Sequence, residues 1–530
     1  MKQQEFFGGE ALAKAVERAY EAGQIDYSLE PLNFEDESGN SVGSVNAGDS
    51  VIFCCRRGER EIELTDAFTD PVFTGFERDI IDPLTFVILT MYNEKYTYLP
   101  VAFAPSRVSG TLAETVAAAG LSQLHCAESE KYAHVTFFLN GGNGSAFAGE
   151  EDICIPSPKG VAFDTVPALS LPAVAEQVAE GMQKGFDFIV TNFANGDVIG
   201  HTSNNAAKVE TARVVDKYLG ETIAKAKAAG YTTLITADHG NLERMITPDG
   251  KADVAHTENL VAFILVPPEG TAPAIARTLF DPNRADGALC DVTPTVLAAL
   301  GVQQPADMLG KPQFQPEKTG KVLLIILDGW GMGVENETNP IFLAETPVWD
   351  DLIKNYPVRY LRASGNAVGL ESGKAGNSEA GHLNIGAGRV VPQDDVRLEN
   401  AMQDGSFGEN PVFISAVEQA KQTGKAVHLF ALLTKKSSHG SIDYPLELLA
   451  LCKRLEMENV FVHIFFDGRS TPPGSAPQLL RELEEKMRQI GVGTIVSGVG
   501  RGIALDRDKN WAKVKKAYDS LTLGKGARYR

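Results

Sequence analysis

The stretch "KVLLIILDGWGMG" (residues 321–333) decides the fold class of this chain. Its aliphatic run, Val322 to Leu327, is long enough for a strand buried on both faces, as strands of parallel sheets are. The run ends in Asp328 and a glycine, so the strand presents a carboxylate at its C-terminal edge. One carboxylate does not make a site, and its partners are expected after other strands of the same sheet.

Strand-like runs alternate with helical patterns over most of the chain. A helical pattern at 204–230 separates two such runs, at 186–197 and 231–241. The helical pattern "PLELLALCKRL" separates two more, at 426–434 and 460–469. This βαβ rhythm predicts an α/β protein whose domains contain mainly parallel sheets flanked by helices.

Length and composition limit the function classes. With 530 residues, the chain exceeds one ordinary core, so two or more domains are expected. The formal charge of −20 disfavours nucleic acid or an anionic membrane surface as the main partner. The six cysteines form no CxxC pair, which predicts a reducing, cytoplasmic compartment. The chain starts with an amphipathic helical pattern and has no long apolar run, so membrane insertion is not expected. The Pro/Gln/Gly-rich segment 301–320 is predicted to be an exposed connector.

Several predicted strands are followed by side chains that can bind metals. The candidate ligands are Asp197, His201, Asp238, His239, His256 and Asp328. Taken singly, each has an ordinary structural explanation, as does Ser378 among the glycines of "GKAGNSEAGH" (373–382), which alone suggests a turn or helix cap. Together, mixed carboxylate and imidazole ligands suit a pair of Mn²⁺ or Zn²⁺ ions better than Ca²⁺. A serine beside two such ions is a natural acceptor for a phosphoryl group.

The motifs "LLIILDGWG", "GNSEAGH", "NFANGDVIGHT", "TADHGN" and "AHTEN" resemble those of the cofactor-independent (2,3-bisphosphoglycerate-independent) phosphoglycerate mutases of the alkaline phosphatase superfamily. The likeness continues in "EKYAHVTFFLNGG", "IPSPKG" and "DRDKNW", and covers nearly the whole chain. It implies an alkaline-phosphatase-like domain plus a smaller phosphotransferase domain. It also implies interconversion of 3- and 2-phosphoglycerate by a cytoplasmic monomer that needs no 2,3-bisphosphoglycerate. Two divalent ions are implied, Mn²⁺ first, with Mg²⁺, Co²⁺ and Zn²⁺ also compatible with the ligands.

The resemblance also implies roles for individual residues. Ser378 would be the nucleophile that forms a phosphoserine, and Lys131 would help to hold the phosphoryl group. One metal would be bound by Asp197, His201 and His256, and the other by Asp328, Ser378, Asp238 and His239. The small phosphorylated carboxylate substrate would be bound by Arg57, Arg60, His439, Arg469, Ser470, Arg501 and Arg507. Any one of these arginines, taken alone, is more often part of a surface ion pair.

The order of the motifs is rotated relative to this family. There the "LDGWG" strand begins the protein and "AHT" lies near its end, whereas here the strand follows the segments that normally close the chain. The chain therefore resembles a circular permutant with new termini inside its second domain. The metal and phosphoserine domain is then expected at 106–394. The substrate-binding domain is expected to be split into 1–105 and 395–530.

Three departures from the family pattern leave other functions open. Ser470 stands where the family has an aspartate that positions or deprotonates the substrate hydroxyl, and a serine is no useful base near pH 7. Ser441 replaces a second histidine in "KKSSHGS", and Gly502-Ile503 replaces an aromatic pair. One alternative is a related enzyme that transfers a phosphoryl or phosphonyl group to another small acceptor or to water. Another is a silent metal-binding scaffold, which the complete set of metal-ligand candidates disfavours.

Overall fold

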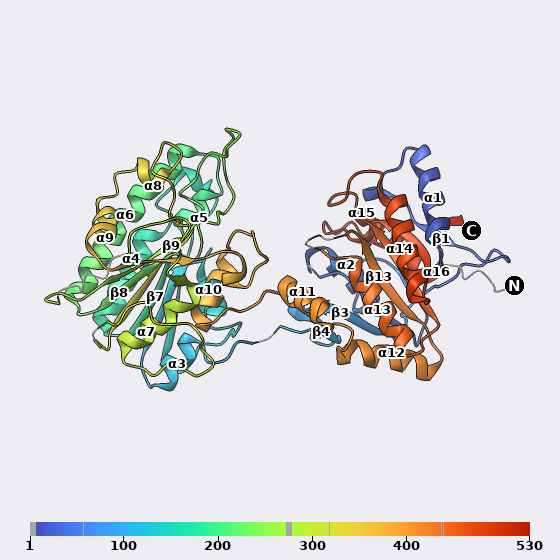
Figure 1. Cartoon of the computed structure of the whole chain (residues 1–530), viewed down its shortest axis with the longest axis horizontal. Coiled ribbons are helices and arrows are strands. Elements are labelled where there is room, and N and C mark those ends of the chain that lie inside the picture. The colour runs from blue at the N-terminus through green and yellow to red at the C-terminus, as the bar shows by residue number, and fades with distance from the viewer. Residues whose placement is uncertain are drawn as a thin grey trace. The chain divides into compact units, whose positions relative to one another are not determined.

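The chain folds into two compact units. The structure, a computed structural model, describes residues 7–56, 58–105, 107–271, 278–316, 318–435, 437 and 439–530. Unit 1 combines Met1–Pro105 with Arg397–Arg530, and unit 2 is Ser106–Val396. Each unit has its own eight-stranded, mainly parallel sheet flanked by helices, so the predicted α/β class is confirmed (Figure 1). Within the described residues, no helix is long and apolar enough to cross a membrane.

The sheet of unit 2 has the strand order β10-β12-β9-β8-β11-β7-β5-β6. In chain order its strands are β5 (Gln123–Glu128), β6 (Glu150–Ile155), β7 (Phe188–Phe193), β8 (Thr232–Thr236), β9 (Val261–Val266), β10 (Gly287–Ala288), β11 (Val322–Leu327) and β12 (Val358–Arg362). Only β9 runs antiparallel to its described neighbours. The quoted stretch supplies β11, which pairs in parallel with β7 and β8.

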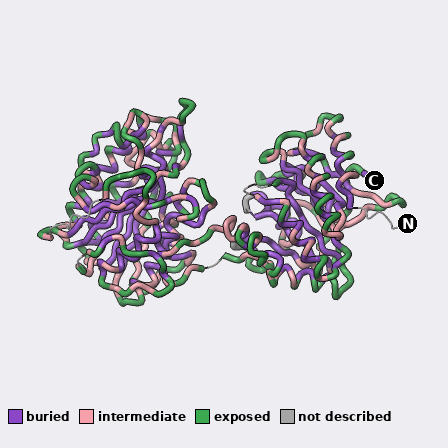
Figure 2. Tube along the Cα trace, in the orientation of Figure 1, coloured by how far each residue is buried: buried purple, intermediate pink, exposed green. Residues whose placement is uncertain are grey.

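Burial explains why β11 lies at the centre of this sheet. All six of its residues are buried, and each fully buried aliphatic side chain contributes about 1.5–3 kcal/mol. Figure 2 shows that each unit has a buried interior, with the exposed residues at its periphery. The helices of unit 2 are α3 (Leu112–Ala118), α4 (Leu171–Lys184), α5 (Asn195–Gly200), α6 (Asn205–Ala228), α7 (Val292–Leu300), α8 (Pro340–Leu343), α9 (Pro347–Asn355) and α10 (Ser378–Ala387), with a π-helical turn η3 at His134–Phe138.

The sheet of unit 1 has the order β16-β1-β15-β14-β13-β2-β3-β4. Its strands are β1 (Leu32–Phe34), β2 (Ser50–Phe53), β3 (Thr85–Thr90), β4 (Val101–Phe103), β13 (Val427–Leu433), β14 (Val460–Phe466), β15 (Thr494–Gly500) and β16 (Ala527–Tyr529). The six strands from β15 to β4 are parallel, and β1 and β16 run in the opposite direction. The helices are α1 (Gly9–Glu21), α2 (Gly58–Thr69), α12 (Pro411–Thr423), α13 (Asp443–Arg454), α14 (Ala476–Ile490), α15 (Arg501–Ala504) and α16 (Trp511–Leu523). Helix α11 (Asp394–Asp404) spans the boundary between the units.

Phe7 and Tyr529, close to the two ends of the described chain, pack into one core of unit 1. The backbone oxygen of Phe7 accepts a hydrogen bond from Ile495 N at 2.8 Å, and the Tyr529 hydroxyl donates to Ile495 O at 3.4 Å. Both aromatic side chains are buried in the same hydrophobic cluster. Both ends of the described chain are therefore anchored to the same residue of β15.

The local predictions are largely confirmed. The four predicted runs contain β7, β8, β13 and β14, and the helical pattern at 204–230 contains α6. The connector prediction is partly wrong. Described residues of 301–320 form neither helix nor strand, but Met308 and Phe314 are buried in the unit 2 core. Their apolar side chains add to that core, which the segment's polar composition concealed.

Candidate metal centre and nucleophile

Four adjacent parallel strands of unit 2 deliver ionisable side chains to one edge of the sheet. Asp328 directly follows β11, and Asp238 and His239 follow β8. Asp197 lies in the short helix α5 after β7, and Lys131 lies three residues beyond β5. Carboxyl ends of neighbouring parallel strands meet at the same edge, which is where sites form in such sheets.

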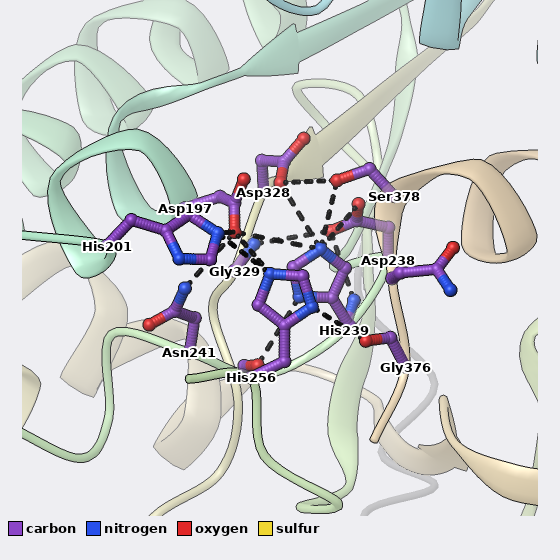
Figure 3. A network of polar contacts seen from close by, with 12 residues as sticks. Asp197, His201, Asp238, His239, Asn241, His256, Asp328, Gly329, Gly376 and Ser378 are labelled. Atoms are coloured by element: carbon purple, nitrogen blue, oxygen red, sulfur yellow. Dashed lines mark hydrogen bonds and ion pairs between the residues drawn. The ribbon is translucent and has the colours of Figure 1, made fainter. Parts of the chain in front are cut away.

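Ser378 is the first residue of α10 and points into this group of side chains (Figure 3). The side chain of Asn377 caps the helix by accepting a hydrogen bond from Ala380 N, which fixes the orientation of the first turn. The adjoining glycines allow a close approach. A Cβ at Gly381 would lie 2.6 Å from Asp238 O, and one at Gly376 would lie 2.0 Å from Ala363 O.

The hydroxyl oxygen of Ser378 lies among three polar side chains. Lys131 Nζ donates to Ser378 Oγ at 2.8 Å, and His239 Nε2 lies 3.0 Å from the same oxygen. The hydroxyl donates to Asp328 Oδ1 at 3.3 Å. Lys131 Nζ also bonds Asp197 Oδ2 at 2.6 Å and Asp328 Oδ1 at 3.0 Å. A side-chain nucleophile, a cation and two carboxylates therefore share one buried position.

Two imidazoles meet Asp197 in a way that calls for a cation. The Nδ1 atoms of His201 and His256 lie 2.8 and 2.7 Å from the backbone oxygens of Val254 and Gly376. A carbonyl oxygen only accepts, so each Nδ1 carries the hydrogen, and in the neutral imidazole each Nε2 presents a lone pair. The two Nε2 atoms are 3.0 Å apart and lie 3.2 and 3.0 Å from Asp197 Oδ1. Such convergent lone pairs fit a divalent metal ion, with the carbonyls orienting the ligands.

Burial of three carboxylates around one lysine sets the electrostatics of the centre. Burial raises the pKa of Asp238 to about 6, and the Asp328 charge adds to this shift. Burial also acts to raise the pKa of Asp197, but its bonds to His201 and His256 and the Lys131 charge outweigh this and hold it well below its ordinary value. The same carboxylates raise the pKa of Lys131 despite its burial. One cation cannot neutralise three carboxylates, so the donor set fits additional positive charge from divalent ions.

All the candidate metal ligands from the sequence are brought together in unit 2, and one further histidine joins them. Ligand atoms of Asp197, His239 and His256 lie within 4.8 Å of one another, as do those of Asp238, Asp328 and His382. His382 was missed as a candidate. Its Nδ1 donates to Ser378 O at 2.8 Å and its Nε2 lies 3.1 Å from Asn192 Nδ2, while burial lowers its pKa to about 4. His382 therefore helps to hold α10 in place. In the sequence, the signal for this role was its position four residues after Ser378, one helical turn away.

The substrate candidates other than Lys131 lie in unit 1, and they differ in burial. Arg60 and Arg501 are almost fully buried, and His439 is 14% exposed at its side chain. Arg60 Nη1 donates to Leu505 O at 2.9 Å, and Arg501 forms a close ion pair with Asp467. Arg469, Ser470 and Arg507 are exposed, and Arg57 lies outside the described residues.

The carboxyl edge of the unit 1 sheet also holds acidic groups that were not predicted as site residues. Asp467 directly follows β14, and Glu61 lies in the first turn of α2, after β2. Their position was the available signal in the sequence, because "FFDGR" places Asp467 two residues before Arg469 and "RRGERE" places Glu61 directly after Arg60. Buried arginines and carboxylates thus lie together at the end of parallel strands.

Two protein-family models match different parts of the chain. Residues 24–304 match the model of the metalloenzyme superfamily, which is more than half of the chain. Residues 398–530 match the model described as the N-terminus of BPG-independent PGAM.

Comparison with individual proteins points the same way. The chain is 41% identical over 310 residues to a 2,3-bisphosphoglycerate-independent phosphoglycerate mutase of Synechococcus elongatus, covering 58% of this chain and 57% of that protein. It is 42% identical over 301 residues to the protein of the same name from Moorella thermoacetica, covering 56% of each. The match therefore spans little more than half the length of these relatives. Among solved structures, a phosphoglycerate mutase of Leishmania mexicana aligns over 52% of both chains with 26% identity and a TM-score of 0.40.

Proposed function

Because the chain belongs to the metalloenzyme superfamily, we propose that it is a metal-dependent phosphotransferase that interconverts 3-phosphoglycerate and 2-phosphoglycerate through a phosphoserine. The observation that carries this proposal is the position of Ser378 Oγ, 2.8 Å from Lys131 Nζ and 3.0 Å from His239 Nε2 among buried metal ligands. The names of the similar mutases and the match of residues 398–530 support the substrate assignment.

Two divalent ions fit the donor groups of unit 2. We assign Asp197, His201 and His256 to one ion, and Asp328, Ser378, Asp238 and His239 to the other. Mn²⁺ is proposed first because it accepts both oxygen and imidazole ligands, and Mg²⁺, Co²⁺ and Zn²⁺ are its competitors. When bound, such ions lower the pKa of a serine hydroxyl and neutralise charge on a phosphoryl group. No 2,3-bisphosphoglycerate is required, because Ser378 itself carries the phosphoryl group.

The side chains around Ser378 have separate tasks in this mechanism. Lys131 keeps its proton because its pKa is raised, so its ammonium group donates to Ser378 Oγ and stabilises the negative charge that develops there. Asp328 accepts the hydrogen bond of the Ser378 hydroxyl. The N-terminus of α10 adds its partial positive charge beside the phosphoryl group.

Unit 1 is proposed to bind the phosphate and carboxylate of the substrate. Its buried arginines retain unused donors. Arg60 Nε and Arg501 Nε and Nη2 have no hydrogen-bond partner among the described residues. Such N–H groups are costly to bury unpaired, and a phosphate or carboxylate oxygen satisfies them. We assign to the same ligand His439 and three exposed residues, Arg469, Ser470 and Arg507. Arg57 is assigned to it from its place in the sequence.

We further propose that the chain is a circular permutant of the mutase order. A model described as an N-terminus matches at residues 398–530, after the metalloenzyme match at 24–304. The relatives align over little more than half of either chain, as expected when one collinear alignment cannot follow a rotated order. The hydrogen bonds of both Phe7 and Tyr529 to the same residue, Ile495, support this proposal.

Transfer to a different small acceptor, or to water, is the second candidate function. The observation that favours it is Ser470, an exposed serine where the mutase pattern has an aspartate. Lys435 also changes the local charge, and it pairs with Glu482 at 3.3 Å. Both functions share the phosphoserine on Ser378 and differ only in the molecule that receives the phosphoryl group.

A coupled assay on 3-phosphoglycerate, with Mn²⁺ and without 2,3-bisphosphoglycerate, separates the two candidates. Formation of 2-phosphoglycerate supports the mutase. Free phosphate with glycerate supports transfer to water, and phosphoserine without either product supports another acceptor. Lack of any phosphoryl incorporation with metal bound would overturn both functions and favour the metal-binding scaffold.

Compartment and assembly are proposed on narrower grounds. None of the six cysteines is in a disulfide, which supports a cytoplasmic location. A monomer is proposed from the resemblance to the family, and a small phosphorylated carboxylate remains the proposed partner rather than nucleic acid or a membrane. Light scattering on the purified chain tests the assembly state.

A further inference from the structure

Glu61 is a buried carboxylate without hydrogen bonds. Its side chain is fully buried in the first turn of α2, and neither of its oxygens has a hydrogen-bond partner among the described residues. Leaving a carboxylate buried and unpaired is costly, and the groups that persist in this state are concentrated at functional sites. The position of Glu61 therefore calls for a reason beyond packing.

The side chain of His439 faces Glu61 across a short gap. His439 Nδ1 lies 3.8 Å from Glu61 Oε1, beyond hydrogen-bond length, and this nitrogen also has no hydrogen-bond partner among the described residues. Glu61 is inaccessible, whereas 14% of the His439 side chain is exposed. The carboxylate thus lies behind an imidazole that a ligand can reach.

The backbone at His439 is held by hydrogen bonds from Arg56, which follows the neighbouring strand β2. Arg56 N donates to His439 O at 3.0 Å, and Arg56 Nη2 donates to Ser437 O at 2.8 Å. Arg56 follows β2 and the His439 loop follows β13, two adjacent parallel strands. The backbone oxygens of Ser437 and His439 are therefore held by Arg56, and a small rotation of the His439 side chain can close the 3.8 Å gap when a ligand binds.

Other unsatisfied groups surround this pair at the same edge of the sheet. Arg501 follows β15 and Asp467 follows β14, and both are about 1% exposed. Arg501 Nε and Nη2 and Asp467 Oδ2 have no hydrogen-bond partner among the residues described. Four adjacent parallel strands, β2, β13, β14 and β15, thus end in buried polar groups with open hydrogen-bonding capacity. The carboxyl edge of a parallel sheet is where ligands bind.

Glu63, a buried carboxylate on the same helix, has a hydrogen bond at one of its two oxygens, and its Oε2 has no partner among the described residues. It is 5% exposed, and its Oε1 accepts a hydrogen bond from Lys509 N at 2.7 Å. Burial raises the pKa of both Glu61 and Glu63. The two residues lie on one helix and are both buried, and they differ in that Glu63 accepts one hydrogen bond whereas Glu61 accepts none among the described residues and faces His439.

We propose that Glu61 and His439 form a proton-transfer pair, in which Glu61 positions the imidazole and His439 takes the proton of the acceptor hydroxyl. The inference rests on the proposed phosphotransferase function and assigns the base that Ser470 cannot supply. The acceptor oxygen forms a bond to phosphorus, and the bond from phosphorus to Ser378 Oγ breaks with its electron pair left on Oγ. The hydroxyl proton moves to His439 Nε2, while Nδ1–H donates to the Glu61 carboxylate. Glu61 is a positioning residue, because it touches only the imidazole.

The titratable and charged groups that face Glu61 decide how the Glu61–His439 pair depends on pH. They are Cys55 after β2, Tyr92 after β3, His439 after β13 and Arg501 of α15. Burial raises the pKa of Glu61, and His439 and Arg501 oppose that rise. Burial also raises the pKa values of Cys55 and Tyr92, so both stay neutral near pH 7. Glu61 must be ionised to orient His439, so acceptor transfer is lost as pH falls through the raised pKa of Glu61.

The experiment compares Glu61→Gln with Glu63→Gln as the matched control. Both the mutase reaction and hydrolysis pass through Ser378, so their ratio isolates the acceptor step from metal loading. We expect Glu61→Gln to lower the mutase-to-hydrolysis ratio at least about tenfold and to remove its acid limb, because general acid–base catalysis contributes roughly 10²–10⁴-fold. Glu61→Asp should restore part of the ratio, and Glu63→Gln should leave the ratio unchanged.

A second measurement does not depend on activity. A ¹³C NMR titration of the Glu61 carboxyl in the whole chain should show a pKa above the ordinary value. In His439→Gln it should rise further, because a group that opposes the shift is lost. An unchanged Glu61 titration would overturn the pairing even if the chain proves not to be a mutase. An unchanged activity ratio in Glu61→Gln, or equal losses in both glutamine variants without rescue by aspartate, would overturn the catalytic role. If the Glu61 titration shows the pairing with His439 but no phosphoserine forms, the proposed function is refuted and the pairing is not.

Discussion

The carboxyl edges of the two sheets collect similar residues but satisfy them differently. In unit 2 most of the ionisable groups bond to one another, with Lys131 Nζ joining Asp197, Asp328 and Ser378 within 3.0 Å, and one carboxylate oxygen, Asp238 Oδ2, has no hydrogen-bond partner among the described residues. In unit 1 the neighbouring groups leave bonds open, because Glu61, Asp467 and Arg501 each keep buried atoms without a hydrogen-bond partner among the described residues. The first edge resembles a prepared reaction centre, and the second resembles a binding surface that a ligand completes.

Under the proposed function, this difference corresponds to chemistry in unit 2 and selectivity in unit 1. A nucleophile needs fixed neighbours, because electrostatic stabilisation works through groups that do not reorganise during the reaction. A site that discriminates between acceptors gains from open hydrogen-bonding groups, because the wrong ligand leaves them unpaired. Changes in unit 2 should therefore abolish phosphoryl transfer altogether, whereas changes in unit 1 should alter where the phosphoryl group goes.

The largest expected effect is at the nucleophile. Ser378→Ala removes the oxygen that would carry the phosphoryl group, and it should reduce both mutase activity and hydrolysis by at least roughly 10⁴-fold. The fold should persist, because one buried hydroxyl is lost from a helix start that Asn377 still caps. Phosphoserine detection by mass spectrometry and steady-state assays measure the result. Ser372→Ala, an exposed serine of the same loop, is the control, and near-normal turnover in Ser378→Ala would refute the assignment.

Metal removal should have the second-largest effect on activity, and its structural effect should be confined to unit 2. Prolonged chelation is expected to bring both activities to background, and Mn²⁺ should restore them, because the convergent Nε2 atoms of His201 and His256 need a cation between them. Elemental analysis should find about two ions per chain after reloading. Hydrogen exchange should change near α5 and α10 and remain constant in the unit 1 sheet. Full activity after verified metal loss would contradict the metal centre.

The sequence predicted unit 2 better than unit 1 for a physical reason. Asp328, Asp238 and His239 follow strands whose apolar runs are unmistakable, so their meeting at one sheet edge could be inferred from topology. The role of His382 and the carbonyl bonds of His201 and His256 depend on side-chain directions that no spacing fixes. In unit 1 the arginines were recognisable by chemistry, but burial decides their state. Arg501 is enclosed with Asp467 while Arg469 is exposed, and nothing in their local sequence distinguishes them.

A substitution at position 470 tests the selectivity assigned to unit 1. Ser470→Asp places a carboxylate in the exposed position after β14, where it can take a hydroxyl proton. If the chain is a mutase, the mutase-to-hydrolysis ratio should rise by roughly tenfold, below the usual range for general-base assistance because His439 already acts. If the chain serves another acceptor, the added negative charge should instead lower its native activity. Ser470→Asn is the control of equal size, and an unchanged ratio in Ser470→Asp would mean that this position does not govern acceptor choice.

The smallest expected effect concerns the interior of the unit 1 sheet, where polar groups are fully paired in contrast to those at its edge. His463 lies 2.7 Å from Ser497 Oγ and 3.0 Å from His428, whose other ring nitrogen lies 3.2 Å from Asp49. Burial and the neighbouring His428 hold the pKa of His463 well below its ordinary value of 6.5. Below pH 6.5 the unfolded chain then binds more protons than the folded chain. The free energy of unfolding should therefore decrease as the pH is lowered, by up to about 1.4 kcal/mol per pH unit. In His463→Gln, which is less stable overall, that part of the slope should vanish. Hydrogen exchange of β13 and β14 between pH 7.5 and 5.5 measures it, and equal slopes in the two proteins would show that the buried histidine does not set the acid stability of unit 1.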